Sequence, residues 1–101
     1  MTFDLFEDTY LCRGLIRFEP HEQGNVEFDG RMGDFIAYCE NLPGVVSQGI
    51  SYEDAHKNLK EAFKATIESY LSDNKTIPWR NRNEQRWEQS VLIAVEAKAD
   101  E

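Results

Sequence analysis

The side chains of this sequence that are able to do chemistry are mainly carboxylates, and several of them fall at the ends of expected elements. Asp34 and Glu40 flank one apolar run, and Asp54 stands at the start of an expected helix. Carboxylates that converge on metal ions are what a metal-dependent nuclease requires. However, a carboxylate at a helix start is already expected for capping and for the helix dipole. We therefore predict no catalytic residue, no metal site and no enzymatic activity.

A covalent mechanism would need a nucleophile beside a base, and few such groups are available. The imidazoles are His21 and His56, and a thiol such as Cys39 would have to lie near one of them. We expect His56 at the edge of the polar face of the helix. Cys12 and Cys39 lack the spacing of a metal or redox motif, so we predict two buried thiols and no cofactor.

One cluster combines aromatic and basic side chains and is the candidate for a partner interface: Trp79, Arg80, Arg82 and Trp87. Such a mixture suits either the stacking of single-stranded nucleic acid or a hot spot between proteins. A third interpretation stays open, in which both tryptophans cover the open sheet face or the end of the helix. The charge of the chain favours the protein interface.

The chain is acidic, with a formal net charge of −8 from 19 acidic and 11 basic residues. This charge repels phosphate backbones and anionic lipid and attracts a basic protein. No stretch approaches the ~18 consecutive apolar residues of a membrane span. The start of the chain is acidic, unlike the basic head of a signal peptide. We therefore expect a cytoplasmic protein without a nucleic-acid or membrane partner.

The chain has 101 residues, of which 41% are hydrophobic, which suits a single domain over residues 1–101. We expect its core over about residues 10–97 and flexible ends at 1–9 and 98–101. Strands are predicted over 10–18, 34–40, 45–48 and 87–97, and a weaker one over 25–29. A capping box at Ser51 predicts a helix that ends near Asn74. Its packed face should hold Tyr52, Ala55, Leu59, Ala62, Phe63, Thr66, Ile67, Tyr70 and Leu71.

A strand, a helix and a further strand in series favour a parallel crossover that lays the helix on the sheet. The predicted fold is therefore α+β, a small β-β-β-α-β sheet with one amphipathic helix on one face. The other face of the sheet would be free to bind a partner.

The stretch 34–49, followed by 51–55 and 58–62, resembles the HicB-type antitoxin family. The shared features are a strand, a Leu-Pro-Gly turn, a short strand that ends in Gly, and a capped helix with two early acidic residues. The matching positions are Pro43, Gly44, Gly49, Ser51, Glu53, Ala55, Asn58 and Ala62. We interpret them as structural: Pro43 presets φ, Gly44 and Gly49 permit positive φ, Ser51 caps the helix, and both alanines allow close packing.

The resemblance implies a partial ribonuclease-H-like fold. Many members continue into a C-terminal DNA-binding domain, and because this sequence departs from that pattern we carry over no DNA-binding function. The resemblance also implies that the chain neutralises a small basic HicA-type mRNA endonuclease by covering its active site. Two other hypotheses stay open. The chain could be an orphan HicB-like module that self-associates as a dimer or tetramer, or binds a ligand, without any toxin. It could also be an enzyme, which would require metal binding or turnover.

Overall fold

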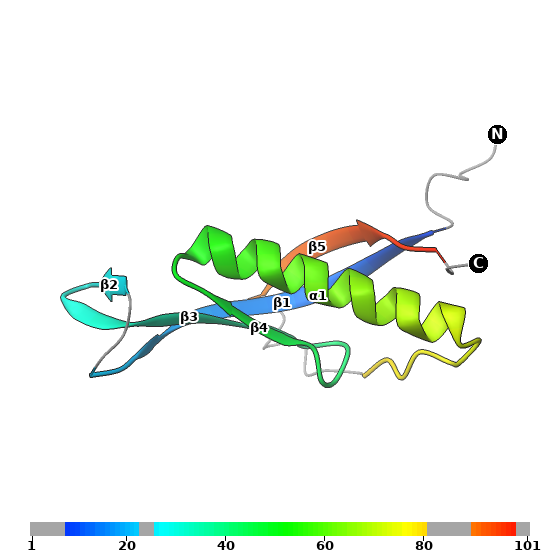
Figure 1. Cartoon of the computed structure of the whole chain (residues 1–101), viewed down its shortest axis with the longest axis horizontal. Helices are drawn as coiled ribbons and strands as arrows, with labels where there is room; N and C mark the ends of the chain where they lie inside the picture. Colours follow the sequence, from blue (N-terminus) through cyan, green and yellow to red (C-terminus); the bar gives the residue numbers. More distant parts are fainter. Residues whose placement is uncertain (1–7, 23–25, 81–89, 99–101) are drawn as a thin grey trace.

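A computed structural model of the chain describes residues 8–22, 26–80 and 90–98. Five strands form a single sheet, and one helix lies across one of its faces (Figure 1). The elements in chain order are β1 (Thr9–Pro20), β2 (Val26–Phe28), β3 (Arg31–Cys39), β4 (Val46–Gly49), α1 (Tyr52–Ser72) and β5 (Val91–Glu96). The predicted α+β class is confirmed, and the weakly predicted strand over 25–29 is present as β2.

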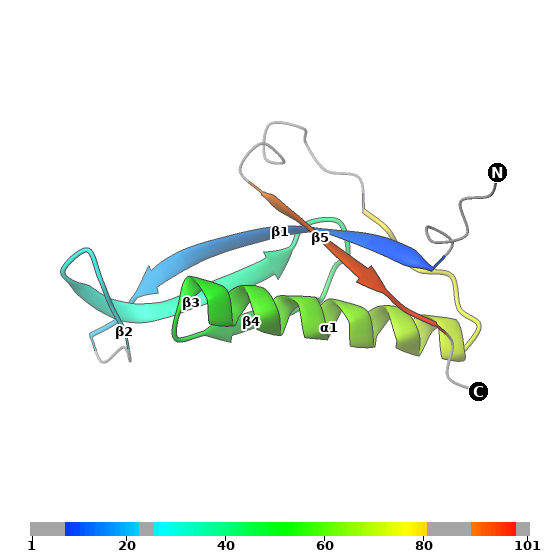
Figure 2. The same cartoon turned by 90° about the horizontal axis from the view of Figure 1, so that it is seen from above.

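The sheet has the strand order β2-β3-β1-β5, and β4 also pairs with β3. All of these pairings are antiparallel, so the predicted parallel crossover is wrong. The reason lies in residues 73–80, a segment that follows α1 and turns back along the sheet (Figure 2). In it, the Arg80 backbone N–H donates to the Asn41 carbonyl at 2.9 Å, beside the turn after β3. As a result, β5 runs in the same direction as the helix.

Both ends of α1 are set by local hydrogen bonds, as predicted. Ser51 has extended backbone angles, φ −142° and ψ 168°, and its hydroxyl accepts from the Asp54 backbone N–H at 3.0 Å. At the other end, Asn74 has a φ of 56°, and the Lys75 N–H donates to the Tyr70 carbonyl at 2.9 Å. This is the Schellman arrangement, in which a left-handed residue terminates the helix.

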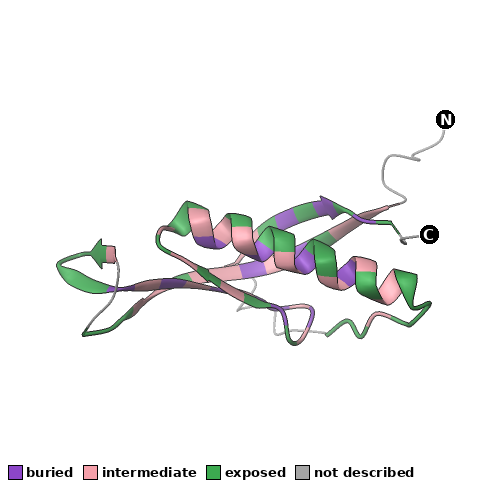
Figure 3. Cartoon of the chain, viewed as in Figure 1, coloured by how far each residue is buried: buried purple, intermediate pink, exposed green. Residues whose placement is uncertain are grey.

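The hydrophobic core lies between α1 and the sheet (Figure 3). The helix buries a stripe with a spacing of four residues: Ala55, Leu59, Phe63 and Ile67. The sheet side is provided by alternate residues of three strands: Cys12, Phe35, Ala37, Cys39, Ile93, Val95 and Ala97. Burying a side chain the size of Leu, Ile or Phe contributes roughly 1.5–3 kcal/mol, so this interface accounts for much of the stability.

Tyr52 departs from the predicted packed face of the helix, because 42% of its surface is exposed. It is the first residue of α1, and a helical side chain covers the turn before its own position. The ring therefore lies over the start of the helix, where it meets the ring of Phe35 edge-on at a centroid distance of 6.5 Å.

Gly44 and Gly49, which both belong to the positions that match the HicB-type family, have different structural roles. Gly44 has a φ of +87°, which confirms the predicted positive φ in the turn. Gly49 does not share this property: among the described glycines, only Gly30 and Gly44 have positive φ, so that expectation was wrong. Instead, a Cβ at Gly49 would meet the Asp54 carbonyl carbon at 2.7 Å. Glycine is needed there because β4 and the start of α1 approach closely.

The first and last residues that the structure describes lie beside each other, next to the paired strands β1 and β5. β1 begins at Thr9, within the stretch 1–9 that was expected to be flexible. The Ala97 backbone N–H donates to the Asp8 carbonyl at 3.0 Å, and Lys98 Nζ lies 3.7 Å from the Asp8 carboxylate. The remaining residues of the expected flexible ends, 1–7 and 99–101, lie outside the described part. The helix that the structure describes is not apolar enough to span a bilayer.

Candidate functional site

The segment that resembles HicB-type antitoxins forms one continuous unit of β3, its turn, β4 and the start of α1. Asn58 joins the helix to β4, because its Nδ2 donates to the Gln48 carbonyl at 2.8 Å. Ala55 is fully buried beneath the helix, and Ala62 is half-buried against the core. Glu53 is exposed in the first turn of α1, where its charge favours the helix dipole.

Asn41 is a structural residue that the sequence analysis treated only as part of a turn. Its Oδ1 accepts from the Arg13 backbone N–H at 2.9 Å and from the Cys39 thiol at 3.1 Å. Its Nδ2 donates to the Leu11 carbonyl at 2.8 Å. The side-chain amide of Asn41 thus makes the hydrogen bonds to β1 that the backbone of a neighbouring strand would make, just beyond the point where β3 ends. Periodicity carries no signal for this role, because two of the three partners, Arg13 and Leu11, are 28 and 30 residues away in sequence.

Cys12 and Cys39 are buried, unbonded thiols, as predicted. They share a hydrogen bond that, together with burial, raises the pKa of Cys12 well above its usual range. The same hydrogen bond lowers the pKa of Cys39, whose thiol also donates to Asn41. Burial keeps both groups from solvent, so their contribution here is to packing.

The carboxylates considered for metal chemistry do not converge. Asp34 and Glu40 are six residues apart along and just beyond β3, about 20 Å at the rise of a strand. Asp34 Oδ2 lies 3.4 Å from His21 Nε2, and Asp54 lies at the helix start. Within the described ranges, no three His, Cys, Asp or Glu side chains are grouped so that they could hold a metal ion. His56 is half-buried on α1.

The predicted aromatic and basic cluster is described only in part. Trp79 lies between Tyr10 and Phe63, with ring centroids 6.5 and 6.2 Å away, and 46% of its surface is exposed. Trp79 therefore packs against the core between β1 and the helix, and not on the open sheet face that was one of the predicted positions. Arg82 and Trp87 lie outside the described residues, so the predicted cluster cannot be assembled from them.

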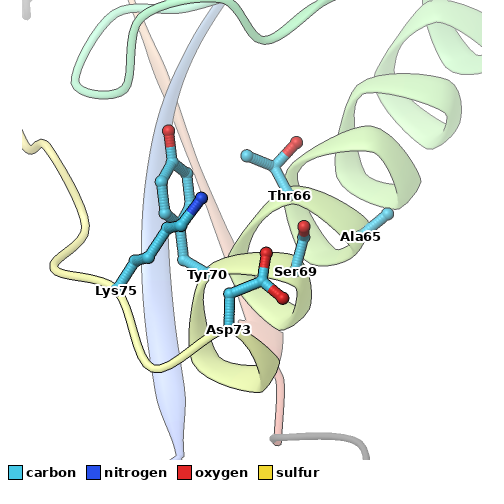
Figure 4. A pocket seen from close by; sticks show the side chains of 6 residues that line it. All are labelled: Ala65, Thr66, Ser69, Tyr70, Asp73 and Lys75. Atoms are coloured by element: carbon cyan, nitrogen blue, oxygen red, sulfur yellow. The ribbon is translucent and has the colours of Figure 1, made fainter.

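An open pocket of about 440 Å³ lies beside the C-terminal half of α1 (Figure 4). Its lining comes from α1 and the segment that follows it: Ala65, Thr66, Ser69, Tyr70, Asp73 and Lys75. The Thr66 hydroxyl is already used, because it donates to the Ala62 carbonyl at 2.8 Å. The charged side chains of the lining are one carboxylate, Asp73, and one amine, Lys75. This balance of charge does not favour any class of ligand.

An aromatic surface, formed by Phe18, Phe28, Phe35 and Tyr52, lies at the end of the sheet near the β2–β3 turn. The three phenylalanine rings contact one another at centroid distances of 5.2–5.6 Å, and Tyr52 meets Phe35 at 6.5 Å. Phe28 is 49% exposed, and Tyr52 is 42% exposed. The sequence analysis missed this surface, because the rings come from three strands and the helix start.

Carboxylates are concentrated at the same end of the molecule. Over residues 17–22, 26–35 and 50–54 there are seven carboxylates and two arginines, Arg17 and Arg31. The carboxylates, called the carboxylate rim below, are Glu19, Glu22, Glu27, Asp29, Asp34, Glu53 and Asp54.

The face of the sheet opposite α1 carries a different set of side chains. Its register places on this open sheet face Leu11, Arg13, Leu15, Arg17, Ile36, Tyr38, Val46, Gln48, Leu92 and Ala94. Leu11, Val46 and Leu92 are 49%, 55% and 57% exposed. The same register places Glu19, Glu27, Asp34 and Glu96 on this face, so it carries two arginines and four carboxylates.

Comparison with known proteins gives two relatives with similar coverage of this chain. A UPF0150 protein of Synechocystis sp. is 37% identical over 46 residues, which are 46% of this chain and 58% of the relative. A UPF0150 protein of Thermoplasma acidophilum is 38% identical over 52 residues, which are 52% of this chain and 75% of the relative. The chain thus spans less than two thirds of the length of the Synechocystis relative. No protein-family model and no solved structure matches the chain. The Thermoplasma match, at 38% identity over most of that relative, shows that the chain belongs to the UPF0150 family.

Proposed function

We propose that the chain is a HicB-like antitoxin, which binds and neutralises a small basic HicA-type mRNA endonuclease in the cytoplasm. The observation that carries the proposal is the segment 34–62, which resembles HicB-type antitoxins and folds as one unit through Gly49, Ser51 and Asn58. The UPF0150 relatives suggest a family of the toxin–antitoxin kind.

The charge of the chain is suited to such a partner. An endonuclease that acts on mRNA must hold phosphates with basic side chains. A protein with a net charge of −8 is attracted to those side chains and competes with the RNA for them. Neutralisation then needs no catalytic residue in the antitoxin, only a stable complex that covers the cleft of the nuclease.

The test is co-expression with a neighbouring short gene that encodes a small basic protein. We expect that protein alone to arrest growth and co-expression of the chain to restore it. The two proteins should also purify in a fixed ratio, and their dissociation constant should rise with salt. Growth arrest that the chain does not relieve, or a basic neighbour that does not co-purify, would contradict the proposal.

A second candidate is an orphan HicB-like scaffold that self-associates without a toxin. The open sheet face favours it, because Leu11, Val46 and Leu92 leave apolar surface exposed there. Light scattering would then show a dimer or tetramer, which Leu92→Glu should dissociate. A monomer at high concentration would exclude this candidate.

A further inference from the structure

We propose that the aromatic surface is the docking site for the basic partner, and that this surface binds an arginine-containing segment of it. The inference rests on the proposed function and goes further by naming the place and the chemistry of recognition. Three observations carry it: the exposure of the rings, the distribution of charge, and contacts between arginine and aromatic rings within the chain.

The rings are exposed because the sheet continues beyond the helix. β1, β2 and the start of β3 extend past the first turn of α1 (Figures 1 and 2), and residues there are largely exposed (Figure 3). Phe28 and Tyr52 therefore leave 49% and 42% of their surface in solvent, although Phe35 beside them is buried. Large aromatic side chains that are held rigidly and half-exposed are typical centres of binding energy in protein interfaces.

The charge around these rings selects a basic partner. The carboxylate rim contributes seven acidic groups at this end of the molecule, of which Glu19, Glu27 and Asp34 lie by register on the opposite face of the sheet. Arg17 pairs with Glu19 on that opposite face at 3.5 Å, so Arg31 is the arginine on the side of the rings. Asp29 and Glu53 are exposed at the β2–β3 turn and in the first turn of α1, next to the exposed rings.

The open sheet face is the competing surface, and the charge beside its exposed apolar side chains argues against a basic partner. Its exposed Leu92 is paired in register with Arg13. The carboxylates of this face lie away from that pair: Glu19, Glu27 and Asp34 at the β2–β3 end, and Glu96 at the last residue of β5. A basic segment placed over Leu92 would meet the like charge of Arg13, which costs affinity. The exposed apolar side chains of the two surfaces are thus distinguished by the charges next to them, Arg13 at Leu92 but Asp29 at Phe28 and Glu53 at Tyr52.

The chain itself shows how an arginine meets these rings. Arg31 Cζ lies 5.9 Å from the centroid of Phe18, within the aromatic surface. Arg17 Cζ lies 5.4 Å from the centroid of Tyr38 on the other face. A guanidinium stacks on an aromatic face and donates to carboxylates in the same plane. The exposed faces of Phe28 and Tyr52, with Asp29 and Glu53 nearby, offer the same combination to an arginine from outside.

The experiment measures binding of the co-purifying basic protein to the full chain and to three single variants by calorimetry. Phe28→Ser and Tyr52→Ser remove the exposed rings, and Leu92→Ser is the matched control on the open sheet face. We expect the two ring variants to weaken binding at least 10-fold and Leu92→Ser to change it less than 2-fold. Circular dichroism identifies the variants that fold, and only these are used for calorimetry. If Phe28→Ser does not fold, the affinity of Tyr52→Ser alone tests the docking site.

The outcomes separate the two proposals. If the wild type binds but only Leu92→Ser weakens binding, the docking site is wrong and the proposed function stands. If no basic protein binds the wild type, the proposed function fails. An octa-arginine peptide then tests the surface alone. NMR shifts centred on Phe28 and Tyr52 would support the aromatic surface as a site for arginine, and shifts elsewhere, or none, would overturn it.

Discussion

Replacing Asn41 by alanine tests whether one side chain holds the middle of β1 beyond the end of β3. The substitution removes three hydrogen bonds, which join Asn41 to the Arg13 N–H, the Cys39 thiol and the Leu11 carbonyl at 2.9, 3.1 and 2.8 Å. At about 1 kcal/mol for each bond, the expected loss in the free energy of unfolding is about 3 kcal/mol. That is a large share of the roughly 5–15 kcal/mol that stabilises a domain of this kind.

Urea unfolding followed by circular dichroism measures this loss. With an m-value of about 2 kcal/mol/M, a loss of about 3 kcal/mol lowers the midpoint by about 1.5 M. Asn58→Ala is the matched control, because it removes a single bond of 2.8 Å at an exposed site, and it should cost about 1 kcal/mol or less. Asn41→Asp keeps the acceptor for Arg13 but turns an oxygen toward the Leu11 carbonyl, so it should cost at least as much as alanine. If Asn41→Ala costs no more than Asn58→Ala, the side chain does not hold β1 and the argument is refuted.

Three further predictions concern the segment that resembles HicB-type antitoxins and the core beneath it. Ser51→Ala should lower the free energy of unfolding by about 1 kcal/mol and Ser51→Asp should restore it, whereas equal effects of both changes would speak against capping. Gly49→Ala should cost more than about 2 kcal/mol, because its Cβ would meet backbone atoms of α1. Gly30→Ala, where a Cβ has open space but φ is +74°, should cost only about 1–2 kcal/mol. If Gly30→Ala cost more than Gly49→Ala, β4 would be able to shift away from α1 and the close approach at Gly49 would not be required. The thiols of Cys12 and Cys39 should react with a thiol reagent only slowly in the native protein and rapidly in urea, and fast native labelling would contradict their burial.

The helix was the most predictable element because its signals are local. Ser51 and Asn74 bracket α1 through hydrogen bonds to residues within a few positions in sequence. The spacing of the apolar residues then identified Leu59, Phe63 and Ile67 as its buried stripe. Strand alternation was similarly informative, since one side of a half-buried strand must be apolar.

Features that depend on strand register or on the path of a connection were not predictable. The direction of β5 depends on the segment after α1, which turns back past Asn41, and no local pattern encodes that turn. The contact of Asn41 with β1 and the meeting of Phe18, Phe28 and Phe35 likewise depend on which strands pair and where. In each case, the residue types were visible in the sequence but their neighbours were not.

The residues by which this chain resembles HicB-type antitoxins are used by its own fold. Gly49, Ser51 and Asn58 are each used by a contact inside the chain, so keeping them preserves the unit of β4 and α1. None of those contacts requires a second protein. On the proposed function, a partner would therefore be recognised by side chains that the fold leaves exposed. Phe28 and Tyr52 are such side chains, and changing them should weaken binding of that partner in the variants that still fold.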